Sequence, residues 1–486
     1  MLTREQESAE EGARESANEG ERSVFAPDLR WEGHPFREML RLSWPIAISM
    51  VSYAAMTLVD TLFVGRLGAE ALAGVGIGGM ASFTLICFVF GLMRGVKILT
   101  AQGVGAGRGS ESKAFLLAGL ALALGLGFVI AGVGQVVAGL LPLITATPAS
   151  GSHAETYLGI RTLGSPVVLV YVALREYRYG LGDSRSPMIA AVVGNVVNIG
   201  LDYLLIFVAD WGVAGAAVAT VAGQVVEAGL LVAAQRSEGL PLRGLTLGAV
   251  RAVLRIGLPS GVQFFLEVGS FAVMAGMLAA LSDIEMAAHQ IVIQAIHFTF
   301  LPILAFGEAA AVMTGQAVGA RRDTMVRGIA YRALLLAGSY AALCTVALVT
   351  SAETFARAFT DESAVIAAAI PLFWVAAAFQ IADAANVVAR SALQGTGDVR
   401  VPAAVGIVTA WVMTPPATYF LGYELGLGAL GGWLGIAGEI AIGAVIFWWR
   451  LLRGGWQSAA ARTRAEVEAE TAAAHSDESP AIEMAA

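Results

Sequence analysis

Long apolar stretches recur along nearly the whole chain, separated by short segments rich in charged residues, glycine or proline. A helix that spans a bilayer needs about 20 mainly apolar residues. Twelve stretches reach this length, and they predict helices near 39–64, 72–102, 114–141, 154–180, 187–209, 212–235, 249–281, 284–315, 329–351, 363–394, 401–424 and 429–453. The pattern therefore predicts an all-α integral membrane protein. Prolines inside the spans, Pro166 among them, permit kinks.

The first six predicted helices resemble the second six in sequence. The segment TAQGVGAGR at 100–108 matches TGQAVGARR at 314–322, and Pro45 and Pro259 are separated by the same offset. Further on, GLGDSRSP, which begins at Gly180, matches GTGDVRVP, which begins at Gly395. Because each half has an even number of spans, both halves have the same orientation. We predict two parallel six-helix bundles related by a pseudo-twofold axis along the membrane normal, the architecture of alternating access.

Polar segments complete this organisation. We expect a disordered cytoplasmic tail at 1–38, an N-lobe at 39–235, a cytoplasmic linker at 236–248, a C-lobe at 249–453 and an Ala/Glu-rich cytoplasmic tail at 454–486. Basic residues cluster at the connections that follow even-numbered helices, and such residues mark the cytoplasmic side. They include Arg108, Arg175, Arg178, Arg322 and Arg390. The chain is therefore expected in the inner cell membrane, with several spans and both termini in the cytoplasm.

Composition agrees with this class of protein. With 57% hydrophobic and 14% charged residues, and a mean hydropathy of +0.71, the chain has more apolar surface than a soluble core could bury. The net charge of −8 comes from the acidic tails, so nothing favours a nucleic-acid partner. Cys87 and Cys344 lie in apolar stretches and match no metal-binding spacing. The pattern predicts neither a cofactor nor an enzyme.

Four segments resemble the multidrug and toxic compound extrusion (MATE) transporters. They are WPIAISMVSYAAMTLVDTLFVGRLG at 44–68, TAQGVGAGR at 100–108, GLGDSRSPMIAAVVGNVVNIGLDYLLIF at 180–207 and GVAGAAVAT at 212–220. The resemblance implies a V of two six-helix lobes that exports organic, often cationic, compounds in exchange for Na⁺ or H⁺. We expect small organic substrates, a lipid bilayer as the surroundings and a monomer.

Polar residues in the first half predict a cation site. Asp60, Asp202 and Thr220 lie at similar depths in their helices, and Asn198 is one turn from Asp202. Two carboxylates, an amide and a hydroxyl form an oxygen-rich cage that suits Na⁺, and the carboxylates would otherwise share a proton. The resemblance implies that all four match the N-lobe cation site of the family. At the repeat offsets Asp60 corresponds to Met274 and Asp202 to Ala417, so the second half lacks this cage.

The second half has its own embedded carboxylates, Glu267 and Asp383. A charge at bilayer depth costs several kcal/mol, which makes each a candidate functional residue. Gln380 and Asn386 flank Asp383 at helical spacing and form one polar face with it. The two carboxylates resemble a C-lobe cation site of some family members. Either cluster could couple transport to Na⁺ or H⁺, and the second could instead bind cationic substrates.

Arg94, Lys97 and Glu308 predict a contact between the lobes. Glu308 is the repeat equivalent of Arg94, and equivalent helices should line opposite walls of a central cleft. We hypothesise that Arg94 or Lys97 pairs with Glu308 and helps to close the cytoplasmic side. The alternative is that both basic side chains extend to the inner surface.

Two other functions stay open at this point. A flippase for a lipid-linked saccharide would commonly have additional spans and a strongly cationic cavity. An integral membrane enzyme would have clustered His, Asp or Ser at one interface, whereas the embedded charges here are mostly separate carboxylates.

Overall fold

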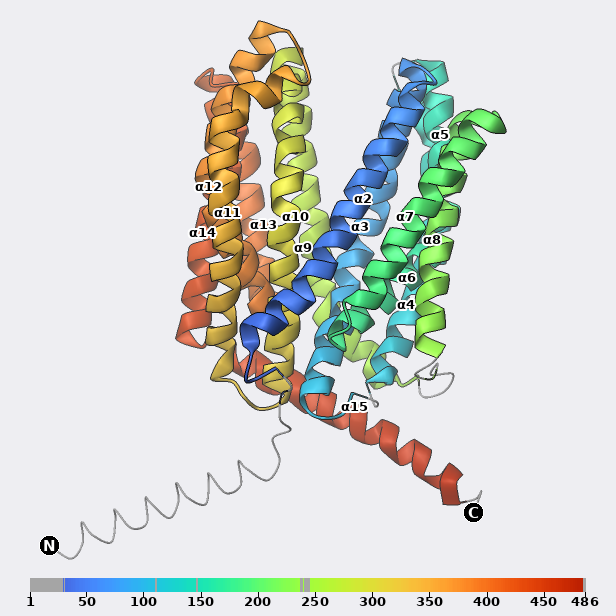
Figure 1. Cartoon of the computed structure of the whole chain (residues 1–486), viewed down its shortest axis with the longest axis vertical. Helices are drawn as coiled ribbons and strands as arrows, with labels where there is room; N and C mark the ends of the chain where they lie inside the picture. The colour runs from blue at the N-terminus through green and yellow to red at the C-terminus, as the bar shows by residue number, and fades with distance from the viewer. Residues whose placement is uncertain are drawn as a thin grey trace, which may run out of the picture.

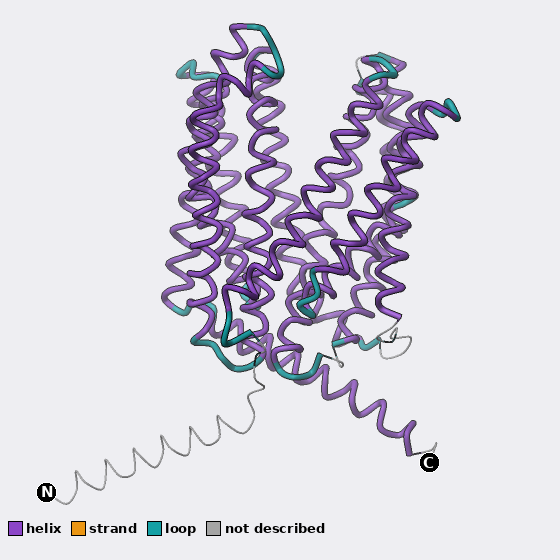
Figure 2. The backbone as a smooth tube through the Cα atoms, in the orientation of Figure 1, coloured by secondary structure: helices purple, strands orange, loops and turns teal. Residues whose placement is uncertain are grey.

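The structure is a computed structural model that describes residue 29 and residues 31–109, 112–145, 147–236, 239 and 245–483, with residues 471–483 described by their backbone only. Most of the predicted tail at 1–38 and of the linker at 236–248 lies outside the described residues. Helix α2 begins within the predicted tail, at Pro35. Figure 2 shows helices joined by short loops throughout the described part.

Helices α2 to α8 form the N-lobe. They are α2 (Pro35–Gly65), α3 (Ala69–Gly105), α4 (Lys113–Leu140), α5 (Pro148–Leu163), α6 (Ser165–Gly180), α7 (Arg185–Tyr203) and α8 (Gly212–Arg236). A 3₁₀ turn, Leu141–Leu143, follows α4, and a π-helical turn, Leu204–Val208, follows α7.

Helices α9 to α14 form the C-lobe. They are α9 (Leu247–Leu281), α10 (Asp283–Gly319), α11 (Met325–Arg357), α12 (Ser363–Gly395), α13 (Arg400–Ala417) and α14 (Ala429–Arg453). A π-helical segment, Thr418–Glu424, follows α13, at the position that corresponds to the π-helical turn after α7. A last helix, α15, spans Gln457–Glu483.

In the described part of the chain, eleven helices are long and apolar enough to cross a membrane, or twelve spans if α5 and α6 count as one. The continuous helix predicted at 154–180 is therefore wrong, because α5 and α6 meet at a bend of 51°. Pro166 explains the break, since it has no N–H to continue the helical ladder. Gly164 lies at the bend, where a side chain would overlap Val221 of α8.

The two lobes touch at one end of the bundle and diverge towards the other (Figure 1). We call the end that lies next to α15 the closed end, and the opposite end the open end. Large apolar side chains face outward along the lobes, for example Phe128 and Val445, whose exposed fractions are 67% and 70%. Such surface is stable only in lipid. The chain is thus a multi-pass membrane protein in which buried polar residues stand out.

Repeated glycines bring the lobes together at the closed end. A side chain on Gly105 of α3 would overlap the carbonyl of Gln316 of α10, and a side chain on Gly319 would overlap the carbonyl of Gln102. The two contacts are equivalent, because Gly105 matches Gly319 and Gln102 matches Gln316 in the repeated segments. A reciprocal contact of equivalent residues lies on a twofold axis. The repeated TAQ and TGQ segments therefore mark where the pseudo-twofold axis passes between α3 and α10.

Helix α15 lies across the closed end, beneath both lobes (Figure 1). Glu468 accepts a hydrogen bond from Arg321 of the C-lobe at 2.8 Å, and its carbonyl accepts one from Arg108 of the N-lobe at 3.1 Å. Val467 is buried among apolar side chains of α3, α4 and α9. These contacts connect α15 to both lobes in this conformation.

We expect Val467→Asp to release α15, whereas Glu468→Gln should have little effect. Removing a buried valine side chain from its apolar surroundings costs about 1.5–3 kcal/mol. An exposed ion pair such as Glu468 with Arg321 contributes about 0–1 kcal/mol. Limited proteolysis of residues 457–470 and the melting temperature in detergent would measure the difference. Equal protection of α15 in both variants would contradict this ranking.

Candidate functional site

The predicted N-lobe residues come together from three helices. Asp60 lies on α2, Asn198 and Asp202 on α7, and Thr220 on α8. Asp202 is fully buried, with an exposed fraction of 0%, and Asn198 and Thr220 are also buried. The carboxyl group of Asp202 interacts with the carboxyl group of Asp60 and with the side-chain amide of Asn198. Asp202 is followed closely by the π-helical turn, a distortion often found at functional sites.

Most polar atoms of this cluster have no hydrogen-bond partner within the described residues. Oδ1 of Asp60, both carboxylate oxygens of Asp202 and both amide atoms of Asn198 are buried without one. The Thr220 hydroxyl donates to the carbonyl of Ala216 at 2.8 Å, which leaves its oxygen as an acceptor. Ionised carboxylates have only acceptors, so neither aspartate can donate to the other. A shared proton or a small cation would satisfy these oxygens together.

Two further side chains complete the N-lobe cluster. Arg161 of α5 interacts with Asp60 and donates to Gln224 of α8 at 3.0 Å. Tyr157, also on α5, interacts with both Asp60 and Thr220, which places Thr220 at the same site. The sequence interpretation missed both residues. Their spacing of four places them on one face of a helix, but α5 is a separate helix that ends at a bend the sequence did not reveal.

The predicted C-lobe residues line a cavity of about 190 Å³. Asp383 of α12 is buried beside it, and Glu267 of α9 faces it from the opposite helix. Arg390 donates to both oxygens of Glu267, at 3.2 and 3.3 Å, and Gln263 donates to Oε1 at 2.8 Å. Glu267 is therefore paired, whereas Asp383 makes no hydrogen bond or ion pair among the described residues.

A third carboxylate, Glu439 of α14, also lines this cavity. Thr414 of α13 donates to it at 2.7 Å. The polar face predicted on α12 is split, since Gln380 donates to Thr299 at 2.6 Å and Asn386 donates to the carbonyl of Ile440 at 3.0 Å. The cavity thus combines three carboxylates with one guanidinium group, which suits a cationic occupant.

Arg175 and Arg390 were counted among the basic residues that mark the cytoplasmic connections, although both lie within the helices predicted at 154–180 and 363–394. They lie inside α6 and α12, at positions that correspond in the two repeats. Each pairs with a carboxylate, Arg390 with Glu267 and Arg175 with Glu176 at 3.0 Å. Charged residues near a predicted helix end resemble loop residues in a sequence, although an internal partner stabilises them within the lobe.

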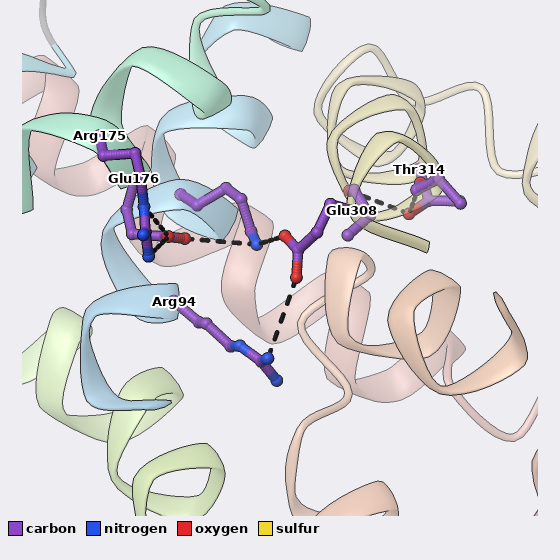
Figure 3. A network of polar contacts seen from close by, with 8 residues as sticks. Arg94, Arg175, Glu176, Glu308 and Thr314 are labelled. Carbon is purple, nitrogen blue, oxygen red and sulfur yellow. Dashed lines mark hydrogen bonds and ion pairs between the residues drawn. The ribbon is translucent and has the colours of Figure 1, made fainter. Parts of the chain in front are cut away.

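A network of five charged residues joins the two lobes near the closed end (Figure 3). Lys97 of α3 donates to Glu308 of α10, and Arg94 lies 3.9 Å from the same carboxylate. Lys97 is also 3.3 Å from Glu176 of α6, which Arg175 holds. Lys97, Glu176 and Glu308 have exposed fractions of 3%, 4% and 8%. The structure therefore brings together the residues hypothesised as an inter-lobe pair.

Several known proteins resemble the chain over most of its length. A family model described as MatE matches residues 45–204 and again residues 259–420, one copy in each lobe. A probable multidrug resistance protein NorM of Bradyrhizobium diazoefficiens is 30% identical over 421 residues, which cover 83% of this chain and 90% of the relative. One from Acinetobacter baylyi is 27% identical over 430 residues, which cover 86% of this chain and 96% of the relative.

Solved structures show the same fold. One, described as the outward-facing conformation of a multidrug resistance MATE family transporter, has a TM-score of 0.80 at 23% identity, covering 89% of this chain and 96% of that chain. The eukaryotic MATE transporter AtDTX14 has a TM-score of 0.82 at 17% identity, covering 89% and 99%. The likeness therefore extends over both lobes.

Proposed function

Because the chain belongs to the MATE family of multidrug efflux transporters, we propose that it exports organic cations in exchange for Na⁺ or H⁺, by alternating access between its two lobes. Members of this family are transporters, so the chain is not an enzyme. The observation that carries the coupling proposal is the pair of Asp60, which is half-buried, and Asp202, which is fully buried. Oδ1 of Asp60 and both carboxylate oxygens of Asp202 lack donors within the described residues.

The N-lobe cluster supports coupling by a small cation. A site with five unsatisfied polar atoms is costly in a dry interior, so occupancy by H⁺ or Na⁺ would stabilise the conformation in which the cluster is closed. Asp60 and Asp202 would supply the negative charge, and Asn198 and Thr220 neutral oxygens. Arg161 would limit the net charge, which favours a monovalent ion over a divalent one.

We assign the C-lobe cavity to a cationic substrate or a second cation. Arg390 neutralises Glu267, so Asp383 and Glu439 would supply the attraction for a cationic group. A volume of about 190 Å³ exceeds the roughly 30 Å³ share of one water molecule several times over. Such a space suits part of an organic compound better than a bare ion.

We propose that the closed end faces the cytoplasm, with the chain in the inner cell membrane as a monomer. Arg108, Arg321 and Arg322 lie in the connections at this end, and basic connections stay on the cytoplasmic side. The conformation is then outward-open. In this proposal the bond from Lys97 to Glu308 helps to hold the cytoplasmic side closed.

Efflux of a cationic dye from proteoliposomes under imposed Na⁺ or pH gradients tests the coupling. We expect Asp60→Asn to lose gradient-driven efflux, because the cluster then has one carboxylate. Glu267→Gln should keep the ion dependence, because Glu267 is already neutralised by Arg390. If only Glu267→Gln lost coupling, the coupling site would lie in the C-lobe, and equal activity of both variants would remove both assignments.

A further inference from the structure

Lys97 lies between two carboxylates that belong to different lobes. It donates to Oε2 of Glu308 on α10, and its Nζ is 3.3 Å from Oε2 of Glu176 on α6. The ammonium group is thus within ion-pair distance of a carboxylate from each lobe. All three side chains are nearly inaccessible, and a buried ammonium without a partner costs several kcal/mol. Lys97 therefore needs a carboxylate in every conformation that keeps it buried.

Glu176 is placed to be such a partner within the N-lobe. Its Oε1 accepts from Nε and Nη2 of Arg175 at 3.3 and 3.0 Å, which fixes the carboxylate towards α3. Its Oε2 is buried, lies 3.3 Å from Nζ of Lys97 and accepts no hydrogen bond from the described part of the chain in this conformation. A small reorientation of the Lys97 ammonium group would therefore let this oxygen accept a hydrogen bond from it.

Glu308 is the partner that the N-lobe loses when the lobes separate. It belongs to α10 of the C-lobe, whereas Lys97, Arg94, Arg175 and Glu176 all belong to the N-lobe. Separation at the closed end would carry Glu308 away from both Arg94 and Lys97. The four N-lobe charges would remain together, and water entering between the lobes would solvate Glu308.

We propose that Lys97 exchanges Glu308 for Glu176 when the lobes separate, so that Glu176 is a positioning residue that makes the inward-open state accessible. This inference rests on the alternating access proposed above. The two carboxylates act in opposite directions. Glu308 stabilises the conformation closed at this end, and Glu176 stabilises the one that is open there.

Distances across the closed end test the exchange. Arg185 and Arg400 are exposed, repeat-equivalent residues at the starts of α7 and α13, so cysteines there can carry spin labels. The natural Cys87 and Cys344 would be replaced by alanine. The readout is the ratio of long to short inter-lobe distances in the full-length protein in lipid.

We expect Glu308→Gln to raise this ratio about tenfold and Glu176→Gln to lower it about tenfold, since removing one partner of a buried pair has a large cost. Glu176→Asp should also lower the ratio, because the shorter side chain can keep Arg175 but does not reach Lys97. Should Glu176→Gln fail to fold, Glu176→Asp still gives the sign of the effect.

The background Lys97→Met separates exchange from a merely structural role. Without the ammonium group, adding Glu176→Gln should change the ratio by less than about twofold. If Glu176 acts only through Lys97, its substitution has no further effect once Lys97 is replaced, so the effects of the two substitutions are not additive. An effect of Glu176→Gln that persists in this background would act through Arg175 and would overturn the exchange. If Glu308→Gln opens the closed end but neither Glu176 variant closes it, the exchange alone fails. No response to Glu308→Gln would refute the proposed closing contact itself.

Discussion

Asp202→Asn is expected to lower ion-coupled efflux strongly while leaving the protein folded. Asp202 is fully buried, and both of its carboxylate oxygens lack a hydrogen-bond partner among the residues that the structure describes. Asparagine has the same shape but neither binds a proton nor contributes charge to a cation site. Loss of a coupling free energy of about 1–3 kcal/mol corresponds to a fall of about 5–150-fold in coupled transport.

Stability should respond in the opposite direction to activity. A buried carboxylate without donors is costly, and the neutral amide removes that cost. The melting temperature of Asp202→Asn in detergent should therefore equal or exceed that of the unaltered protein. It should also cease to rise with added Na⁺ or with falling pH, if either ion stabilises the unaltered protein by binding at this cluster.

Asp210→Asn is the matched control for this prediction. Asp210 lies shortly after Asp202 along the chain, is exposed and has a φ of +56°, a conformation that asparagine tolerates well. Efflux by this variant should match that of the unaltered protein under both gradients. Ion-dependent efflux that survives Asp202→Asn, or that is lost equally in Asp210→Asn, would contradict the role of Asp202.

The sequence was sufficient to predict the contacts that follow from the internal repeat. The register of the repeat relates Arg94 to Glu308, and the structure shows why equivalent positions meet there. Gly105 and Gly319 place the pseudo-twofold axis between α3 and α10, so residues near that axis face their own repeat partners. The proximity of Asp60 and Asp202 could also be predicted, because the depth of each residue in the membrane follows from its position along a helix of constant rise per residue.

Contacts between residues that the repeat does not relate could not be predicted from the sequence. Glu176 contacts Lys97 because α6 packs beside α3 after the bend at Gly164, and the pattern of apolar residues does not encode that angle. Glu439 reaches the C-lobe cavity from α14, although the corresponding residue of α8 is Gly223, which gives no sign of a polar site. Such contacts depend on how each helix is rotated about its own axis. The sequence of a single apolar stretch hardly constrains that rotation, because packing against neighbouring helices sets it.

Gly257→Ala is expected to prevent the lobes from closing at the closed end. Gly257 of α9 faces α3, and an added Cβ would overlap the carbonyl oxygen of Leu92. Across the same contact, a Cβ on Gly95 would lie 2.6 Å from the carbonyl oxygen of Val253. The obstacle in both cases is backbone, which cannot rotate away as a side chain can. Small residues are what allow such close approach of two membrane helices.

Overpacking of this kind costs about 1–3 kcal/mol, which corresponds to a change of about 5–150-fold in the ratio of open to closed conformers at this end. Spin labels at Arg185→Cys and Arg400→Cys would report the shift. Gly276→Ala is the control, since Gly276 lies in the same helix with nothing within 4 Å of a Cβ. Both variants gain the helix preference of alanine over glycine, about 1 kcal/mol, so their difference isolates the contact between the lobes. Identical distance distributions in the two variants would mean that α3 and α9 do not set the closed state.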